Sequence, residues 1–321
     1  MPRAQSPERI ALVAAASDTI RLGSRSFHAA SQVFDRETRE RAWLLYTWCR
    51  HCDDVADGQV LGAAGGEGGD VAEVEKLTRR VLAGERVEGL PYEALAAVLA
   101  EVSIPHDFLL DHIEGFALDA ADWRPQSEAD LVRYCYHVAG AVGCMMAVVM
   151  GVDPEDRETL NGASALGIAF QLSNIARDIA DDAAAGRCYV PAEWLAEAGL
   201  SEANLLDDAN RDALVGLVKR LTDLSAAYEA QARDQVHALP FRARWAVLAA
   251  ARIYGKIGRR VAALGPDAWT QRVVVRRRRK LAYLFVSLWE TLRARKGRHG
   301  AFRDHRPAAE GALPAALLPR G

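Results

Sequence analysis

Two short acidic motifs carry the residues best suited to chemistry. Asp53 and Asp57 stand four residues apart in the first, and Asp178 and Asp182 repeat that spacing in the second. On a helix such a pair shares one face, where the like charges repel and destabilise the helix. An arginine stands shortly before the first aspartate of each pair. The repeated pattern therefore indicates a cation held by carboxylates.

The carboxylates suit Mg²⁺, a hard cation that proteins commonly hold with one or two carboxylates together with substrate phosphates. Two such helices facing each other would form a negative mouth that binds metal and then attracts a diphosphate. The neighbouring Arg50 and Arg177 could contact phosphate oxygens directly, because a guanidinium group matches phosphate geometry. The alternative for either motif is a solvated helix face.

The second motif belongs to a longer polar stripe. Gln171 and Asn174 precede Asp178 and Asp182 at helical spacing, within a segment (166–179) that is otherwise largely apolar. A polar stripe on such a segment should face a polar site rather than a packed core.

Helical periodicity dominates the rest of the chain and predicts an all-α fold. Helices are expected over 39–57, 73–83, 92–102, 131–150, 161–185, 212–236, 242–264 and 274–295. Segments rich in Gly and Pro separate them, and His106-Asp107 is expected in a turn. We expect one domain over 15–296, between an N-terminal segment (1–14) and a disordered tail (297–321).

The overall composition excludes several classes of protein. A net charge of −3 over 321 residues gives no bias toward nucleic acid, and no nucleic-acid partner is expected. Five scattered cysteines argue against disulfides, and Cys49 and Cys52 are interpreted as packing residues rather than a zinc or redox pair. The N-terminus shows no signal peptide, and the apolar stretch 281–292 is too short to cross a bilayer. We therefore expect a soluble, cytoplasmic protein.

Beyond these patterns, the chain resembles the squalene and phytoene synthases, which are head-to-head prenyl transferases, and most of all the bacterial phytoene-forming members. The resemblance covers roughly residues 15–295. Its carriers are segments 23–27, 46–57, 134–143, 171–182 and 186–191.

The resemblance implies an isoprenoid-synthase-type helical bundle around a central apolar cavity. It implies Mg²⁺, with Mn²⁺ as an alternative, held at two diphosphates by Asp53, Asp57, Asn174, Asp178 and Asp182. The residues implied to contact phosphates are Arg25, Arg50, Arg177, Arg272 and Lys280. Those implied to line the prenyl channel or the reacting centre are Ser24, Phe27, Tyr46, Tyr134, Val138, Gly143, Gln171 and Tyr254.

The implied reaction joins two geranylgeranyl diphosphates through a cyclopropyl diphosphate to 15-cis-phytoene, the first committed step of carotenoid biosynthesis, without NADPH. Tyr134 could assist the final proton loss, and the released diphosphate is an equal candidate. Gly140 and Gly143 interrupt a strong helical pattern, where each glycine costs about 1 kcal/mol relative to alanine. We interpret them as room for the substrate channel, with close helix packing as the alternative.

Several alternatives stay open. Squalene and dehydrosqualene synthases use the shorter farnesyl diphosphate, and channel depth, which decides between substrates, cannot be read from spacing. A non-catalytic assembly factor on the same scaffold would be expected to lack the aspartates, which are present. A di-iron bundle would need Glu-x-x-His pairs, which are absent, and an HD-type phosphohydrolase would need more His-Asp pairs. The basic run 276–280 is compatible with contact at the inner membrane face, and hand-over to a carotenoid desaturase is a further expectation.

Overall fold

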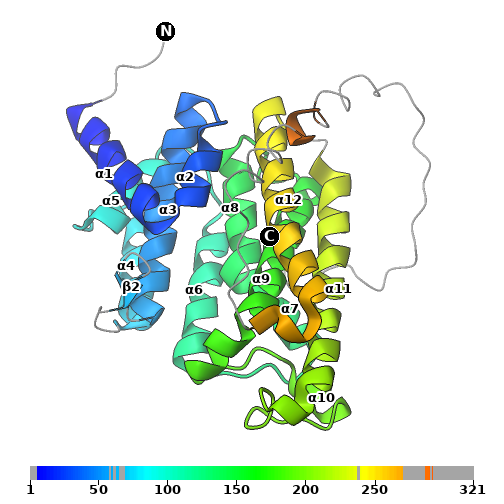
Figure 1. Cartoon of the computed structure of the whole chain (residues 1–321). Helices are drawn as coiled ribbons and strands as arrows, with labels where there is room; N and C mark the ends of the chain where they lie inside the picture. Colours follow the sequence, from blue (N-terminus) through cyan, green and yellow to red (C-terminus); the bar gives the residue numbers. More distant parts are fainter. Residues whose placement is uncertain are drawn as a thin grey trace.

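The computed structural model describes residues 6–57, 59–60, 63–64, 69–236, 239–269, 286–289 and 291. Within these ranges the protein is almost entirely helical, as the sequence predicts (Figure 1). The principal helices are α1 (Pro7–Gly23), α2 (Arg25–Ser31), α3 (Arg36–Asp57), α4 (Val71–Leu82), α5 (Leu90–Leu99), α6 (His106–Ala120), α7 (Glu128–Cys135), α8 (Ala141–Val149), α9 (Arg157–Ala184), α10 (Ala192–Glu197), α11 (Arg211–Gln235) and α12 (Phe241–Leu264).

Shorter elements connect the helices. A π-helix, η1 (Tyr136–Gly140), joins α7 to α8. The 3₁₀ turn η2 (Asp208–Asn210) precedes α11, and the 3₁₀ turn η4 (Gly265–Trp269) follows α12. Strands β1 (Gln59–Val60) and β2 (Ala63–Ala64) pair antiparallel in the glycine-rich loop after α3. A two-residue ribbon of this kind leaves the all-α class unchanged.

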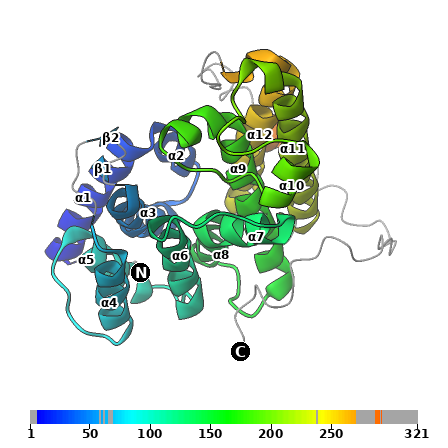
Figure 2. The same ribbon diagram turned by 90° about the horizontal axis from the view of Figure 1, so that it is seen from below.

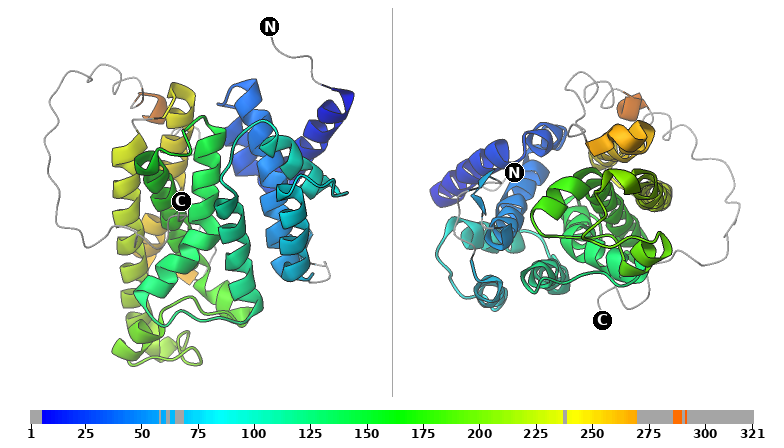
Figure 3. Two further views of the ribbon diagram at one scale, coloured as in Figure 1. Left: turned by 180° about the vertical axis from the view of Figure 1, so that it is seen from behind. Right: turned by 60° about the horizontal axis from the view of Figure 1, so that its bottom comes forward.

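The longest helix, α9, is the axis of the larger half of the bundle. Its 28 residues span about 42 Å, and it packs against α8, η1, α11 and α12. Helices α1, α3, α4 and α5 gather on the opposite side of the molecule, with α6 and α8 between the two groups (Figures 1 and 2). The view from behind shows the same arrangement (Figure 3).

Each half has its own apolar core. The N-terminal core is centred on side chains such as Trp48, Leu95 and Phe108, and α8 contributes Met145 to it. The C-terminal core surrounds the buried face of α9, with Leu172 among its members. The apolar faces of the helices are therefore buried in two cores, and α8 and α9 bring these cores together.

The segment expected as one helix over 131–150 contains the π-helix at its centre. Here the backbones of η1, α8 and α9 approach so closely that a Cβ atom on Gly143 would lie 2.3 Å from the Ala163 carbonyl oxygen. A Cβ atom on Gly167 would lie 2.2 Å from the Ala139 carbonyl oxygen. Only glycine permits this approach. Close helix packing, the alternative interpretation of the mid-helix glycines, is thus a requirement of the fold.

Other sequence expectations need correction or lie outside the described residues. Helix α6 begins at His106, directly after Pro105, so His106 and Asp107 open a helix rather than a turn. Helix α1 begins at Pro7, where the Ser6 hydroxyl accepts from the backbone N–H of Arg9, inside the expected N-terminal segment. The expected tail (297–321) and most of the helix expected over 274–295 lie outside the described residues.

One described helical stretch, Glu128–Val149, is long and apolar enough to cross a membrane by length and composition. Within its most apolar window, 61% is buried inside the protein. A core helix of a bundle has the same composition, because it is surrounded by protein on most sides. All five cysteines are free, as expected, and burial raises the pKa of both Cys49 and Cys52.

Candidate active site

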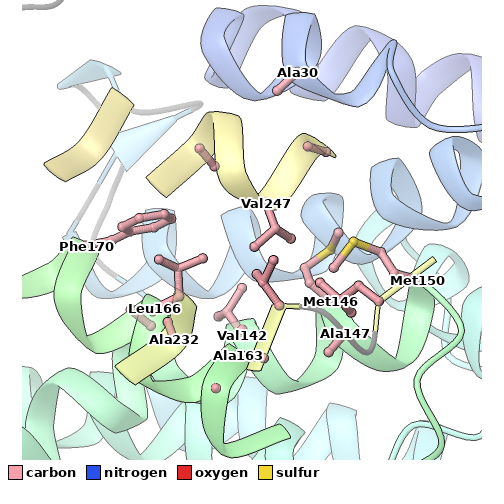
Figure 4. Close-up of a pocket in the computed structure, with 18 of the residues that line it drawn as sticks. Ala30, Val142, Met146, Ala147, Met150, Ala163, Leu166, Phe170, Ala232 and Val247 are labelled. Carbon is pink, nitrogen blue, oxygen red and sulfur yellow. The ribbon is translucent and has the colours of Figure 1, made fainter. Parts of the chain in front are cut away.

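An apolar cavity of about 370 Å³ lies between α2, η1, α8, α9, α12 and the end of α11. Side chains from α8 and α12, such as Met146 and Val247, point into it, and Phe170 lies toward one end with Met150 toward the other (Figure 4). Of the residues predicted to line a prenyl channel, Phe27, Val138, Gly143 and Gln171 line this cavity. Its lining is mainly apolar, so the cavity suits a hydrocarbon group better than a polar one.

Helix α9 supplies a wall that changes from apolar to polar along its length. Its lining residues run from Thr159 to Asn174, about 22 Å of helix. Asp178 and Asp182 follow Asn174 at one-turn intervals and therefore extend the same face. Gln171 and Asn174 are the polar members that reach the cavity itself. The polar stripe predicted from the sequence thus lies where the apolar cavity ends.

The second motif is organised around Arg177 and Asp178. The Arg177 side chain donates from Nε to the Asp178 carboxylate at 2.7 Å and makes a second contact through Nη2. Both side chains are largely buried, with 16% and 17% exposed. Burial raises the pKa of Asp182 to about 7, and the charge of Asp178 adds to the rise while Arg187 opposes it. Negative charge is thus crowded at this end of α9.

The first motif repeats this pattern on α3. Arg50 contacts the Asp53 carboxylate at 2.7 Å and donates two hydrogen bonds to Asp54 at 2.9 and 2.6 Å. Burial lowers the pKa of Arg50, but the hydrogen bond to Asp54 and the charges of both aspartates outweigh it, so the pKa is raised overall. Asp57 is the last residue of α3, and its side chain lies outside the described part of the structure.

The α2 segment connects the first motif to the cavity. Phe27 lines the cavity and makes an edge-to-face contact with Tyr46 on α3, with ring centroids 5.7 Å apart. The Ser24 hydroxyl accepts a hydrogen bond from the Phe27 backbone N–H and so caps α2. Tyr46 itself is not among the lining residues; it lies beside Gly23, where an added Cβ would come within 2.6 Å of the Tyr46 hydroxyl.

Two observations test whether the second motif suits a divalent cation. The Asn174 side-chain oxygen is buried without a hydrogen-bond partner, and Asp182 holds its proton more tightly than an ordinary aspartate. Both are relieved when a cation binds oxygen ligands. Among the described residues no three acidic, cysteine or histidine side chains already converge on one point.

Tyr134 lies apart from the cavity lining. It is 3% exposed, its hydroxyl donates to Asp119 Oδ2 at 2.8 Å, and its ring stacks on Tyr189. Sequence reasoning did not single out Asp119 or assign a role to Tyr189, although Tyr189 belongs to the segment 186–191 that carries the family resemblance. The remaining predicted contacts lie outside what the structure describes, either as side chains or entirely: Arg25, Tyr254, Arg272 and Lys280.

An all-helical bundle with an apolar cavity and carboxylates at its end is the architecture of an isoprenoid synthase. The chain belongs to the squalene/phytoene synthase family, whose model matches residues 20–279. It is 44% identical over 287 residues to the 15-cis-phytoene synthase of Enterobacter agglomerans, covering 87% of this chain and 95% of that protein. It is 42% identical over 294 residues to the enzyme of the same name from Pantoea ananas, covering 88% and 93%.

Solved structures support the fold. A dehydrosqualene synthase in complex with a ligand superposes with a TM-score of 0.77 at 24% identity, covering 89% of this chain and 98% of that one. A squalene synthase from Alicyclobacillus acidocaldarius gives 0.71 at 23% identity, covering 83% and 97%. The predicted all-α isoprenoid-synthase-type bundle is confirmed, and so is the family that the sequence motifs indicate.

Proposed function

We propose that this protein condenses two molecules of geranylgeranyl diphosphate head to head into 15-cis-phytoene, the first committed step of carotenoid biosynthesis. The observation that carries the proposal is the apolar cavity whose α9 wall ends in Gln171, Asn174, Asp178 and Asp182. Such a cavity accepts an isoprenoid tail and places its diphosphate at the carboxylates. The bacterial relatives at 42–44% identity that carry the name phytoene synthase support the choice of reaction.

In this proposal Mg²⁺, or Mn²⁺ in its place, is held by Asp53 and Asp57 at one diphosphate and by Asn174, Asp178 and Asp182 at the other. The bound metal supplies positive charge that stabilises a departing diphosphate. Arg50 and Arg177, which now neutralise aspartates of their own motifs, then turn to the phosphate oxygens. Arg25, Arg272 and Lys280 are further proposed phosphate contacts.

The protein's own contribution to the chemistry is exclusion of water and stabilisation of positive charge on carbon. Departure of the first diphosphate leaves an allylic cation, which the double bond of the second molecule captures, and loss of a first proton closes the ring of a cyclopropyl diphosphate. Loss of the second diphosphate, rearrangement and loss of a second proton complete the reaction. Water would quench either cation, so the apolar lining around Val138, Gly143 and Phe27 is essential. The Phe27 ring face contributes about 0.5–2 kcal/mol to a cation that passes over it.

Product analysis tests the proposal. Purified protein is incubated with Mg²⁺ and radiolabelled geranylgeranyl or farnesyl diphosphate, with and without NADPH. We expect a C40 hydrocarbon from geranylgeranyl diphosphate that needs no NADPH. A C30 product alone would assign the chain to the dehydrosqualene or squalene synthase alternatives. No product from either substrate, with the protein folded, would favour the non-catalytic assembly factor.

The proposal includes a cytoplasmic location with peripheral contact to the inner face of the membrane, because the product is a long hydrocarbon that needs a lipid or a desaturase to receive it. Flotation with vesicles of anionic phospholipid tests the contact. We expect co-flotation that 0.5 M salt weakens, since basic side chains near an anionic surface contribute about 1 kcal/mol each at low salt. Recovery of all the protein in the lipid-free fraction would remove this part of the proposal.

A further inference from the structure

Three segments that are distant in the sequence meet at one carboxylate beside the second motif. Asp119 stands near the end of α6, Tyr134 lies on α7, and Tyr189 follows α9 in the segment 186–191. The Tyr134 hydroxyl donates to Asp119 Oδ2 at 2.8 Å, and the Tyr189 hydroxyl donates to Asp119 Oδ1 at 2.9 Å. Both oxygens of one carboxylate are therefore engaged by the two phenols.

The rings of these tyrosines form part of a stack. Tyr134 and Tyr189 lie 4.8 Å apart between centroids with 19° between their planes, and Trp123 stacks at 5.9 Å and 23° on Tyr134. Tyr134 and Tyr189 are 3% and 8% exposed. Stacking restricts the tilt of both rings, and the hydrogen bonds from their hydroxyls restrict rotation within the ring plane. The orientation of both phenols is therefore fixed.

The stack adjoins the acidic end of α9 and the cavity wall. The Arg187 backbone N–H donates to the Asp182 carbonyl oxygen at 2.8 Å, which ties the segment that carries Tyr189 to the second motif. Tyr134 stands one helical turn before Val138, which lines the cavity.

A carboxylate is unfavourable at this place in α6, because the C-terminal end of a helix carries partial negative charge. Proteins break local rules of this kind at functional or strained sites. We infer that Asp119 is a positioning residue for the reaction proposed above, which holds Tyr134 and Tyr189 beside the second diphosphate site with their hydroxyl protons turned toward itself.

These hydrogen bonds decide whether the two phenols can donate a hydrogen bond to another group or only accept one. A tyrosine has one hydroxyl proton, and here it is given to Asp119, so each phenol oxygen presents only lone pairs to any other group. The two phenols then act as acceptors and electron-rich rings and do not donate to the departing diphosphate. Asp119→Asn keeps one acceptor oxygen and replaces the other with an NH₂ donor, so one of the two hydroxyls loses its acceptor and can rotate toward a competing one.

The test compares Asp119→Asn with Asp122→Asn. Asp122 stands three residues later at the turn after α6, its side chain is 83% exposed, and its φ of 55° is one that asparagine adopts readily. With whichever prenyl diphosphate the wild-type protein converts, we expect kcat to fall on the order of 10²-fold in Asp119→Asn with KM changed less than threefold. The near-UV circular dichroism of the stacked tyrosines should change while far-UV helicity is retained. Asp122→Asn should match the wild type in all three measurements.

A kcat within twofold of the wild type in folded Asp119→Asn would overturn the inference. If Asp119→Asn does not fold, Tyr189→Phe decides, since it removes only one hydroxyl: an unchanged kcat there rejects the inference, and a fall of about tenfold at unchanged KM supports it. Failure of the proposed function itself would be seen in the wild-type product and not in these ratios.

Discussion

Asn174 and Asp178 lie one helical turn apart on α9, and the buried amide oxygen of Asn174 has no hydrogen-bond partner while Asp178 is paired with Arg177. An unpartnered buried acceptor is costly, by about 1–3 kcal/mol. Its place beside a carboxylate at the cavity end makes it suitable as a ligand to a cation. The first prediction concerns this oxygen.

Asn174→Ala should weaken the binding of Mn²⁺ in the presence of inorganic diphosphate by about 10- to 100-fold, because one oxygen ligand is lost. Electron paramagnetic resonance of free Mn²⁺ measures the affinity directly. Asn161→Ala is the matched control: its side-chain oxygen is also buried without a partner on α9, but it does not line the cavity. Equal weakening in both variants would show that the site does not include Asn174.

The raised pKa of Asp182 predicts how the stability of the metal-free protein depends on pH. The folded protein keeps this proton up to about pH 7, whereas the unfolded chain loses it near the ordinary value of 3.8. The folded state therefore binds more protons between these values, and the free energy of unfolding falls as pH rises through that window. Asp182→Asn has no carboxyl to titrate at this position. Its free energy of unfolding should therefore exceed that of the wild type at pH 8 by about 2–4 kcal/mol.

Urea unfolding in the presence of a chelator at pH 4 and pH 8 measures this difference. The two proteins should be nearly equal at pH 4, because this is close to the ordinary pKa of 3.8 and the wild type has lost only the first part of this stability there. Addition of Mg²⁺ with diphosphate should reverse the order at pH 8, because only the wild type retains the ligand. A constant gap at both pH values would mean that Asp182 does not titrate as described.

Two glycine substitutions should change the stability of the protein in opposite directions, because only one of the glycines lies at the contact between α8 and α9. Gly143→Ala would place a methyl group 2.3 Å from the Ala163 carbonyl oxygen and should destabilise the protein by about 1–3 kcal/mol or more. Gly216→Ala on α11 meets nothing within 4 Å and should stabilise it by about 0.5–1 kcal/mol. Thermal unfolding of both variants checks the pair. A neutral Gly143→Ala would show that the helices can separate at little cost.

Much of this arrangement follows from local sequence signals. Helical spacing alone predicts that one face of a long helix carries a polar stripe formed by Gln171, Asn174, Asp178 and Asp182. The helices around Trp48 and Leu172 follow from apolar periodicity in the same way. The turn expected at His106-Asp107 is wrong because Pro105 is compatible with a turn as well as with a helix start, and proline is common just before a helix begins.

The rest depends on contacts between distant segments. No local signal shows that Tyr134 and Tyr189 share Asp119, because their side chains come from α7 and from the segment after α9. The π-helix η1 likewise lies against α9 at Gly167, a contact between distant segments that spacing along the chain does not encode. Pairing of Arg50 with Asp54 could have been anticipated from their i,i+4 positions on α3.

We propose that the carboxylates that follow the cavity lining on α9 promote departure of diphosphate. The direct measurement is the rate of diphosphate release from geranylgeranyl diphosphate in a single turnover, with Mg²⁺, for Asp178→Asn and Asp181→Asn. Both substitutions remove one charge from the same stretch of α9, but the Asp181 side chain is exposed to solvent, whereas that of Asp178 is largely buried. The account predicts a fall of about 10²–10³-fold for Asp178→Asn and a change of less than threefold for Asp181→Asn. Release at the wild-type rate by Asp178→Asn would contradict it.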